Sequence, residues 1–254
     1  MVKWIQGVEE TLRIQPCAEG AANIESMVMS PSELKAAIPP TPLTALTLPS
    51  DRFRHLHSGK VRELYACEGG LLMIATDRLS AFDVILPTGI PGKGIILTQL
   101  SRWWFQQLKG IVAHHLIEPQ DEALATALAG HEALIPRAML VRELPRAPLE
   151  CVVRGYLAGS GWAEYRRSGS LWGRPLPTGL RESEALPEPA FTPTTKAEVG
   201  DKDLPLTPAE TADLAGANRA AELEAASLAL YRFGARRAQA AGLLLADTKF
   251  EFGY

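Results

Sequence analysis

Charged and apolar residues alternate over residues 247–252, directly after the apolar run Leu243–Ala246. If this stretch is an extended strand, Asp247, Lys249 and Glu251 share one face, and the intervening and following phenylalanines point to the other face. The pattern therefore predicts a strand with one core-facing side and one charged side.

Two carboxylates and one ammonium group on one strand face repel one another or form costly pairs unless a ligand uses them. A divalent cation that carries a polyphosphate fits such a face, because carboxylate oxygens hold the cation and the Lys249 ammonium offsets the phosphate charge. An exposed edge face with a surface salt bridge explains the spacing equally well, so the pattern alone leaves both interpretations open.

A glycine turn between two strands is predicted at Gly59. The residues after it alternate as a strand, and Gly69-Gly70 then turns the chain into the apolar strand 71–75. Lys60 and Arg62 share one face beside the turn, an arrangement that can lie over phosphates. A solvated hairpin edge is the simpler interpretation of the same residues.

The apolar strand is followed by a polar segment and then by a helix. Residues 76–83 gather polar groups where the strand ends, a common position for functional residues. Thr98 is expected to open a helix with Leu100, Trp104 and Leu108 on its buried face.

A second unit is expected to begin with the strand 150–156, because the preceding strand 139–144 runs into a proline linker. Arg154 lies near the end of this second strand, and a glycine-rich turn around Ser160 follows it. An arginine, a serine and the free amides of a helix start make a credible phosphate pocket. The alternative is an ordinary helix N-cap beside a surface arginine.

The region before the final strand combines a polar segment with two helices. Residues 187–203 are predicted to be a loop, and a loop of this length is usually functional or disordered. Residues 207–210 form a capping box with proline at the first helical position. The second helix is expected from Gly216 to Gly242, and its buried face would hold Leu223, Ala226, Leu230 and Phe233.

The composition is typical of a globular protein, with 46% hydrophobic and 22% charged residues and a net charge of −3. This charge does not indicate a nucleic-acid-binding surface. No apolar run reaches membrane-spanning length, and the N-terminus lacks the basic-then-apolar order of a signal peptide. Cys17, Cys67 and Cys151 show no metal-ligand spacing and are expected to be reduced thiols of a cytoplasmic protein. Residues 1–28 show neither the hydrophobic periodicity of a helix nor that of a strand, and they are expected to be a disordered extension.

Several stretches of the sequence closely resemble the SAICAR synthetase family, the phosphoribosylaminoimidazole-succinocarboxamide synthases. In the family's order they are SGKVRELY, ATDRLSAFDVILPTGIPGKG, ECVVRGYLAGSGWAEY, FTPTTKAEVGDKD and LLLADTKFEFG. They extend from residue 51 to the last residues of the chain. The combination in one order is highly specific, whereas each motif alone is not.

The resemblance implies an ATP-dependent ligase of de novo purine biosynthesis. In the family's reaction, L-aspartate is joined to the carboxylate of CAIR (carboxyaminoimidazole ribonucleotide) to give SAICAR, ADP and phosphate. ATP converts the carboxylate to an acyl phosphate, which the aspartate amine attacks, so the protein needs to position ligands and neutralise charge. Two alternatives remain open: a small-molecule kinase, and a truncated nucleotide-binding module without turnover.

The resemblance also implies roles for individual residues. The implied ATP-binding residues are Gly59, Lys60 and Arg62 at the phosphates, with the backbone of Arg142 and Leu144 at the adenine. The implied catalytic residues are Asp83, Lys249 and Glu251, and Glu251 is also the implied Mg²⁺ ligand. The implied substrate-binding residues are Ser80, Asp83, Arg154, Gly155, Ser160 and Lys196.

The fold that the resemblance implies is α+β in two lobes. Residues 29–145 would form a nucleotide-binding lobe with an antiparallel sheet, and residues 146–254 would form a mixed α/β lobe for substrate and metal. The family continues past the strand that bears Glu251 into a segment resembling DE-x-x-TPDSSR, which this sequence does not contain. The second lobe is therefore expected to be truncated. The sequence does not indicate an oligomeric state.

Overall fold

The computed structural model of the chain describes residues 3–6, 28–81, 84–196 and 203–254. The chain folds into two compact units. The N-terminal unit comprises residues 18–107 and 115–143, and the C-terminal unit comprises residues 1–17, 108–114 and 144–254. Each unit is built around its own sheet, and the division of the sequence into lobes at residue 145 stays a prediction.

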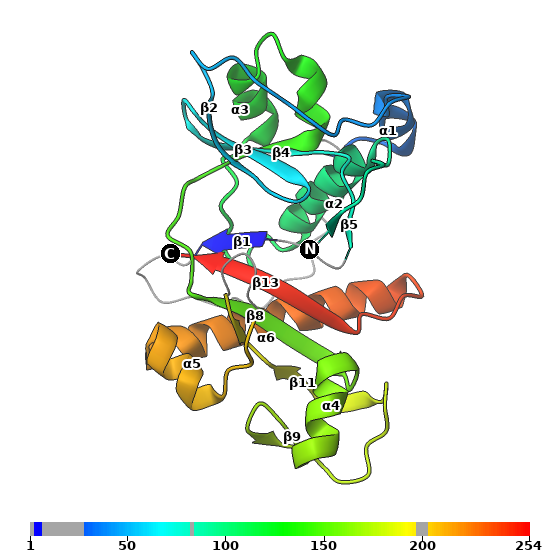
Figure 1. The fold of residues 1–254 in the computed structure, drawn as a ribbon, viewed down its shortest axis with the longest axis vertical. Coiled ribbons are helices and arrows are strands. Elements are labelled where there is room, and N and C mark those ends of the chain that lie inside the picture. The colour runs from blue at the N-terminus through cyan, green and yellow to red at the C-terminus, as the bar shows by residue number, and fades with distance from the viewer. Residues whose placement is uncertain (1–2, 7–27, 82–83, 197–202) are drawn as a thin grey trace. The chain divides into compact units, whose positions relative to one another are not determined.

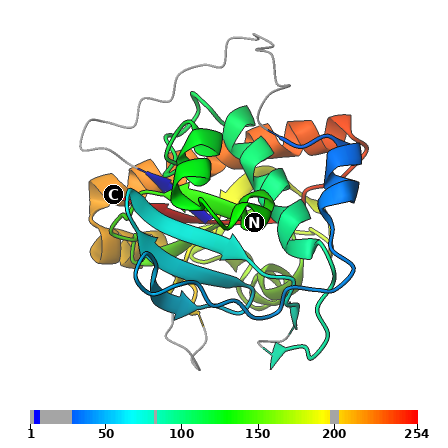
Figure 2. The same ribbon diagram turned by 90° about the horizontal axis from the view of Figure 1, so that it is seen from above.

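An antiparallel sheet forms the centre of the N-terminal unit (Figures 1 and 2). In sheet order its strands are β2 (Arg54–Ser58), β3 (Arg62–Cys67), β4 (Gly70–Ala75) and β7 (Ala138–Val141). Leu72 and Ile74 alternate inward from β4 and pack with Phe53, Tyr65 and Leu140 in a buried apolar core. The predicted hairpin at Gly69-Gly70 is confirmed, because β3 pairs with β4 across it.

Helices and a short hairpin complete the N-terminal unit. They are α1 (Pro31–Ala37), α2 (Lys93–Gln107), α3 (Gln120–Ala127), the 3₁₀ helix η1 (Glu132–Arg137), and the strands β5 (Ser80–Ala81) and β6 (Val84–Ile85). The helix α2 packs against β4 and η1, and α3 packs against β7. A capping box at Ser30 and Glu33 starts α1.

The helix α2 differs from its prediction in both its start and its buried face. It begins at Lys93 rather than Thr98, because Asp77 Oδ1 accepts a hydrogen bond of 2.8 Å from the Gly94 amide. Leu100 is exposed, whereas Thr98 and Gln99 are buried. Both polar side chains donate to carbonyls of η1, so their burial leaves no donor unsatisfied at these contacts.

A mixed sheet forms the centre of the C-terminal unit (Figure 1). In sheet order its strands are β1 (Lys3–Gln6), β13 (Asp247–Gly253), β8 (Leu149–Tyr156) and β11 (Ala185–Phe191), while β12 (Thr194–Thr195) pairs with a further part of β8. The β1–β13 pair is parallel, and β13, β11 and β12 pair with β8 in the antiparallel sense. Sheets that are largely antiparallel, together with helices, confirm the predicted α+β class.

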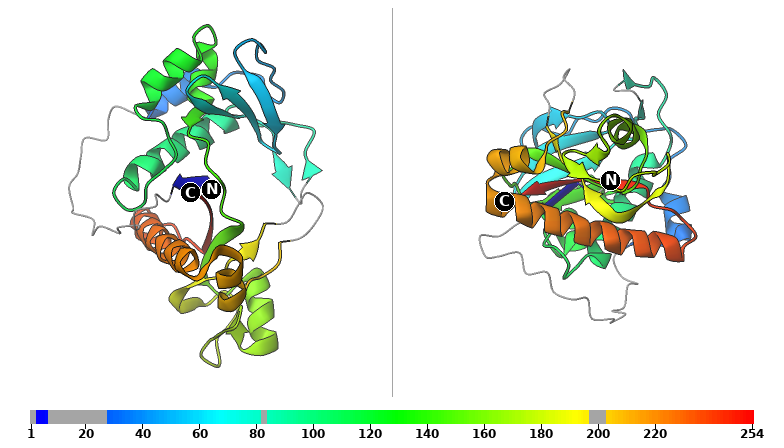
Figure 3. Two further views of the ribbon diagram at one scale, coloured as in Figure 1. Left: turned by 90° about the vertical axis from the view of Figure 1, so that its left-hand side faces the viewer. Right: turned by 90° about the horizontal axis from the view of Figure 1, so that it is seen from below.

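The helices of the C-terminal unit are α4 (Gly159–Ser168), α5 (Pro208–Ala215) and α6 (Ala217–Ala240), and β9 (Ser170–Leu171) pairs with β10 (Arg174–Pro175). The helix α6 packs against β8, β11 and β13, and α5 lies beside it (Figure 3). The predicted inward face of α6 is buried at Leu223, Ala226 and Leu230, and Phe233 is half-buried. The predicted capping box at Thr207 and Glu210 starts α5.

Two segments predicted to lack regular structure contain strands. Lys3–Gln6 pairs with the edge of β13 as β1, although it lies within the predicted disordered extension 1–28. Trp and Ile at its centre are typical strand residues. The predicted loop 187–203 contains most of β11 and all of β12, because β8 offers both of them pairing partners. Residues 1–2, 7–27 and 197–202 lie outside the described residues.

Replacing Asp77 by alanine should destabilise the protein by about 3–5 kcal/mol, because it leaves the buried Arg137 guanidinium without its carboxylate partner. Urea unfolding measures this change. Glu164→Ala is the matched control, because it breaks an exposed ion pair with Arg167 and should cost about 1 kcal/mol or less. Equal losses in the two variants would show that the Asp77–Arg137 pair does not stabilise the fold.

Candidate active site

The strand β13 places charged and apolar side chains on opposite faces, as its alternation predicts. Phe250 and Phe252 are buried, at 7% and 3% exposure. Lys249 and Glu251 lie on the other face, beside β8, where Lys249 is opposite Val152 in the antiparallel register. The strand β13 lies between β1 and β8 rather than at an edge of the sheet, and along its charged face Asp247 is exposed, Lys249 is half-buried and Glu251 is buried. The position of the strand and the burial of Glu251 disfavour the surface salt bridge interpretation.

A network of alternating charges joins this face to β8 and to the residue after β12. Lys196 Nζ lies 2.5 Å from Glu150 Oε1 and 2.6 Å from Glu251 Oε1. Lys249 Nζ forms an ion pair with the second oxygen of Glu150 and lies 3.6 Å from Asp203 Oδ2. The side chains of Glu150 and Glu251 are only 4% and 3% exposed, so water solvates little of their charge, and the lysine ammonium groups compensate for this loss.

The Glu150 carboxylate is held in its charged form. Burial opposes its ionisation, but hydrogen bonds and charges from Lys196 and Lys249 outweigh burial and lower the pKa of Glu150 from 4.5 to about 2. Burial also opposes the charge of Lys196, but hydrogen bonds with Glu150 and Glu251 raise the pKa of Lys196. At neutral pH this part of the site presents fixed ammonium and carboxylate groups.

A half-buried arginine near the end of β8 forms a second part of the site. Arg154 Nη2 lies 3.1 Å from Ser160 Oγ, and its guanidinium lies 5.1 Å from the centre of the Trp172 ring. The Arg154 Nε–H is buried and has no hydrogen-bond partner in the described part of the chain. Burial lowers the pKa of Arg154, and the negative charge of Asp247 counteracts this effect. A buried donor on a cation at the start of α4 suits an anionic ligand.

Gly155 has a steric role in the structure. A Cβ atom at this position would lie 1.7 Å from Tyr231 Oη. Its amide donates to Ala246 O at 2.9 Å, and Tyr231 Oη donates to Leu245 O at 2.7 Å. These contacts explain the glycine by close packing of α6 against β8, without any substrate contact.

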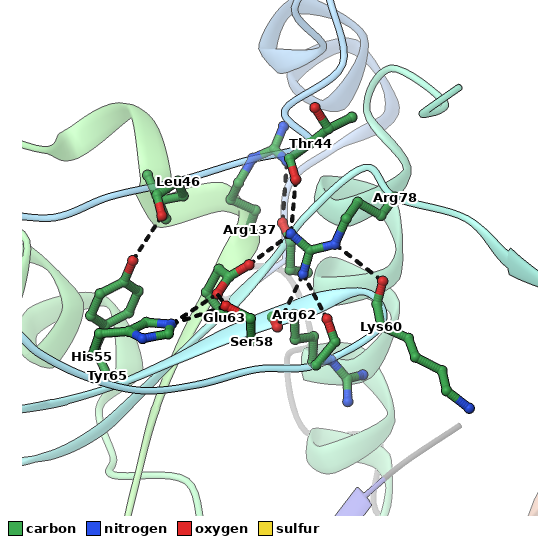
Figure 4. A network of polar contacts seen from close by, with 12 residues as sticks. Thr44, Leu46, His55, Ser58, Lys60, Arg62, Glu63, Tyr65, Arg78 and Arg137 are labelled. Atoms are coloured by element: carbon green, nitrogen blue, oxygen red, sulfur yellow. Dashed lines mark hydrogen bonds and ion pairs between the residues drawn. The ribbon is translucent and has the colours of Figure 1, made fainter. Parts of the chain in front are cut away.

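The glycine turn in the N-terminal unit is closed by a hydrogen bond of 2.8 Å from the Gly59 amide to Arg62 O. The Lys60 side chain is exposed and extends away from the surrounding polar network (Figure 4). Arg62 and Lys93 line a small pocket of the same unit together with Thr76, Thr98 and Met139. Burial lowers the pKa of Lys93, and the charge of Arg62 lowers it further. Two cations at one pocket suit a polyanion.

The remaining predicted residues are distributed as follows. Ser80 lies on β5, and Asp83 lies outside the described residues. Arg142 and Leu144 belong to different units. The Arg142 amide donates to His115 O at 2.8 Å, so this N–H is already used in a hydrogen bond within the N-terminal unit.

The described residues contain no cluster of three or more His, Cys, Asp or Glu side chains that could hold a metal ion. One carboxylate supplemented by nucleotide phosphate oxygens and water is nevertheless a normal donor set for Mg²⁺. Glu251 therefore fits a cation that arrives with a nucleotide better than a free cation. In the described part of the chain, no helix is long and apolar enough to span a membrane.

Sequence reasoning missed Glu150 and Trp172, and it gave Arg78 no role of its own within the polar segment 76–83. Glu150 stands alone in an apolar strand, and it shares a strand face with Arg154 because they are four residues apart. An isolated charge at a buried strand position was the available signal. Arg78 and Trp172 act through contacts with distant residues, for which the sequence gives no spacing rule.

Comparison with known proteins identifies the family. Residues 55–254 match the family model of SAICAR synthetase. The chain belongs to the SAICAR synthetase family. The phosphoribosylaminoimidazole-succinocarboxamide synthase of Desulforapulum autotrophicum is 48% identical over 199 residues, which are 78% of this chain and 68% of that protein. Membership confirms the predicted enzyme class, a ligase of purine biosynthesis.

Solved structures of the SAICAR synthetase family support the same fold. A structure described as SAICAR-synthase from Saccharomyces cerevisiae complexed with SAICAR has a TM-score of 0.71 and 38% identity, and the match covers 82% of this chain and 71% of that one. A type-2 SAICAR synthetase in complex with ADP has a TM-score of 0.59 and 25% identity, over 78% and 74% of the two chains. These likenesses confirm the predicted two-lobed SAICAR synthetase-like fold.

The stabilising effect of Glu150 should depend on pH. A pKa that falls from 4.5 to about 2 on folding corresponds to roughly 3 kcal/mol of stability, present above pH 4.5 and lost as the pH falls toward 2. Glu150→Gln should therefore be less stable than the wild type at pH 6, and the difference should shrink below pH 4.5. Urea unfolding from pH 3 to 6 measures it, and a pH-independent difference would contradict the assignment.

Gly155→Ala should destabilise the protein by about 1–3 kcal/mol, because the added Cβ overlaps Tyr231 Oη. Tyr231→Phe removes the overlapping oxygen, so the double variant should lose less stability than the sum of the two single variants. Gly161→Ala is the control, because its Cβ would meet nothing closer than 3.4 Å. Additive losses in the double variant would mean that Tyr231 is not the reason for the glycine.

Proposed function

We propose that the chain catalyses the ATP-dependent joining of L-aspartate to the carboxylate of CAIR, with SAICAR, ADP and phosphate as products. Family membership and the SAICAR and ADP named for related structures support these ligands. The observation that carries the proposal is the charge arrangement of the C-terminal unit. Its sheet combines the Glu150–Lys196–Glu251 network with the Arg154–Ser160 pair, and thus offers groups for a metal-bound polyphosphate and for a separate anion.

The proposed chemistry makes the CAIR carboxylate reactive before the new bond forms. A carboxylate oxygen attacks the γ-phosphorus of ATP, and ADP leaves, which gives an acyl phosphate. The aspartate amine then attacks the acyl carbon, and inorganic phosphate leaves with the former carboxylate oxygen. The sequence of steps needs no nucleophile from the protein, so catalysis consists of positioning the ligands and stabilising charge.

The proposed ATP contacts come from the glycine turn and the segment after β7. Gly59 brings the backbone close to the phosphates, and Lys60 and Arg62 offset their charge. Arg142 and Leu144 lie on the segment proposed to meet the adenine, where groups other than the Arg142 amide would make the contact. The exposed Lys60 and the half-buried Arg62, which lie on the turn closed by the Gly59 amide, support a role in phosphate binding.

The proposed metal is Mg²⁺, held by Glu251 together with phosphate oxygens of the nucleotide. When bound, the ion would neutralise charge on the transferring phosphoryl group. Lys196 holds one oxygen of Glu251 and fixes the orientation of its carboxylate. Lys249, anchored by Glu150, is proposed to lie beside the phosphates as a second positive group.

The proposed CAIR contacts are assigned to its phosphate, to its base and ribose, and to the substrate carboxylates. Arg154 and Ser160 would bind the CAIR phosphate. Gly155 would allow Tyr231 of α6 to pack against β8, the strand that carries Arg154. Ser80 and Asp83 are proposed for the base and ribose, with Asp83 in a catalytic role. Lys196 is proposed for the substrate carboxylates. No contact with nucleic acid or membrane is proposed, and a cytoplasmic location fits the free thiols of Cys67 and Cys151.

Two substitutions should separate the nucleotide from the substrate. Lys60→Ala should weaken Mg-ATP binding by about 1–3 kcal/mol and leave CAIR binding unchanged, because it removes a charge-assisted phosphate contact. Arg154→Lys should weaken CAIR binding selectively, because lysine keeps the charge and loses the planar fork. Calorimetric titration with each ligand measures both effects, and multiple-turnover ADP release by the wild type should require CAIR and aspartate together.

Unchanged ATP affinity in Lys60→Ala would remove the glycine turn from the proposed site. Multiple-turnover ADP release with CAIR in the absence of aspartate would instead favour a small-molecule kinase, because formation of the acyl phosphate alone gives at most one ADP per active site. If Arg154→Lys lost affinity for both ligands and unfolded more easily, Arg154 would be a structural residue.

A further inference from the structure

The guanidinium of Arg78 contacts the carbonyl oxygens of the glycine turn (Figure 4). Its Nε donates to Lys60 O at 3.1 Å, and its Nη2 donates to Gly59 O at 2.7 Å and to Arg62 O at 3.3 Å. Three of the five N–H donors of one side chain thus hold carbonyls of a four-residue turn.

The two other donors of Arg78 anchor the guanidinium itself. Nη1 donates to Thr44 O at 2.8 Å and to Glu63 Oε1 at 2.7 Å. Glu63 is buried and its second oxygen accepts hydrogen bonds from Ser58 Oγ at 2.6 Å and His55 Nε2 at 3.1 Å. The arginine is therefore saturated with acceptors and cannot shift without breaking several bonds.

The direction of these bonds has a consequence for the other side of the turn. In a planar trans peptide, the carbonyl of one residue and the amide N–H of the next point in opposite directions. Because Gly59 O and Lys60 O point to Arg78, the amides of Lys60 and Val61 point away from it. Capture of the carbonyls also keeps their negative ends away from an anion that approaches these amides.

We infer that Arg78 is a positioning residue that fixes the glycine turn with its amides and cations directed at the nucleotide phosphates. This inference rests on the proposed nucleotide role of the turn and adds a residue that touches no ligand. Lysine cannot replace Arg78, because an ammonium has only three donors and no fork that spans several carbonyls.

The experiment compares Arg78→Lys with Arg174→Lys, a control that changes the same residue type in an ion pair with Glu224 in the C-terminal unit. Amide hydrogen exchange of Gly59 is measured without ligands, and KM values for ATP and CAIR are measured with the folded proteins. In Arg78→Lys, exchange at Gly59 and the KM for ATP should each rise about tenfold, because the turn loses its preorganisation. The KM for CAIR should stay within about twofold, and the control should match the wild type in all three measurements.

A folded Arg78→Lys protein with wild-type exchange at Gly59 and wild-type KM for ATP would overturn the inference, even if its unfolding midpoint fell. If Arg78→Lys does not fold, Glu63→Gln tests the same anchor, since it weakens the hold on the guanidinium. It should raise Gly59 exchange and the KM for ATP together, and no change in either would count against the inference. If the wild type does not bind Mg-ATP, the proposed function fails, whereas Gly59 exchange still reports whether Arg78 holds the turn.

Discussion

The carboxylate of Glu150 is the group on which the charged side of the C-terminal unit depends. It lies within a buried strand, where an uncompensated charge would be costly, and it is stabilised because two lysines share its oxygens. One lysine follows β12 and the other lies on β13, so a single buried charge fixes three segments of the chain. Without it, Lys196 and Lys249 would have no common anchor, and the ion pair between Lys196 and Glu251 would lose the carboxylate that positions Lys196.

The N-terminal unit contains two buried ion pairs of the same kind, formed by the neighbouring residues Asp77 and Arg78. Asp77 accepts from the start of α2 and pairs with the buried Arg137, while Arg78 pairs with the buried Glu63 and holds the glycine turn. In each case a buried ion pair is saturated with further hydrogen bonds, which offsets the cost of burial. Asp77 thus determines where α2 begins, and Arg78 determines the conformation of the glycine turn.

Local pattern predicted several of the elements but neither the strands β1, β11 and β12 nor the partners of the buried charges. The alternation of β13, the capping box of α5, and the proximity of Arg154 to Ser160 were predictable, because each depends on residues close in sequence. The start of α2 was not, because its capping carboxylate lies 17 residues earlier. The Glu150–Lys196 contact joins positions 46 residues apart, and only strand pairing brings them together. Gly155 was predicted for a ligand-related reason, while the structure supplies a packing reason in Tyr231.

If these fixed charges serve to activate a carboxylate by phosphorylation, the fate of one oxygen atom reveals it directly. CAIR labelled with ¹⁸O in its carboxylate is converted with ATP and aspartate, and the released inorganic phosphate is analysed by mass spectrometry. Passage through an acyl phosphate predicts that each phosphate molecule formed from doubly labelled CAIR contains one ¹⁸O atom. Unlabelled phosphate alongside newly formed SAICAR would contradict the account.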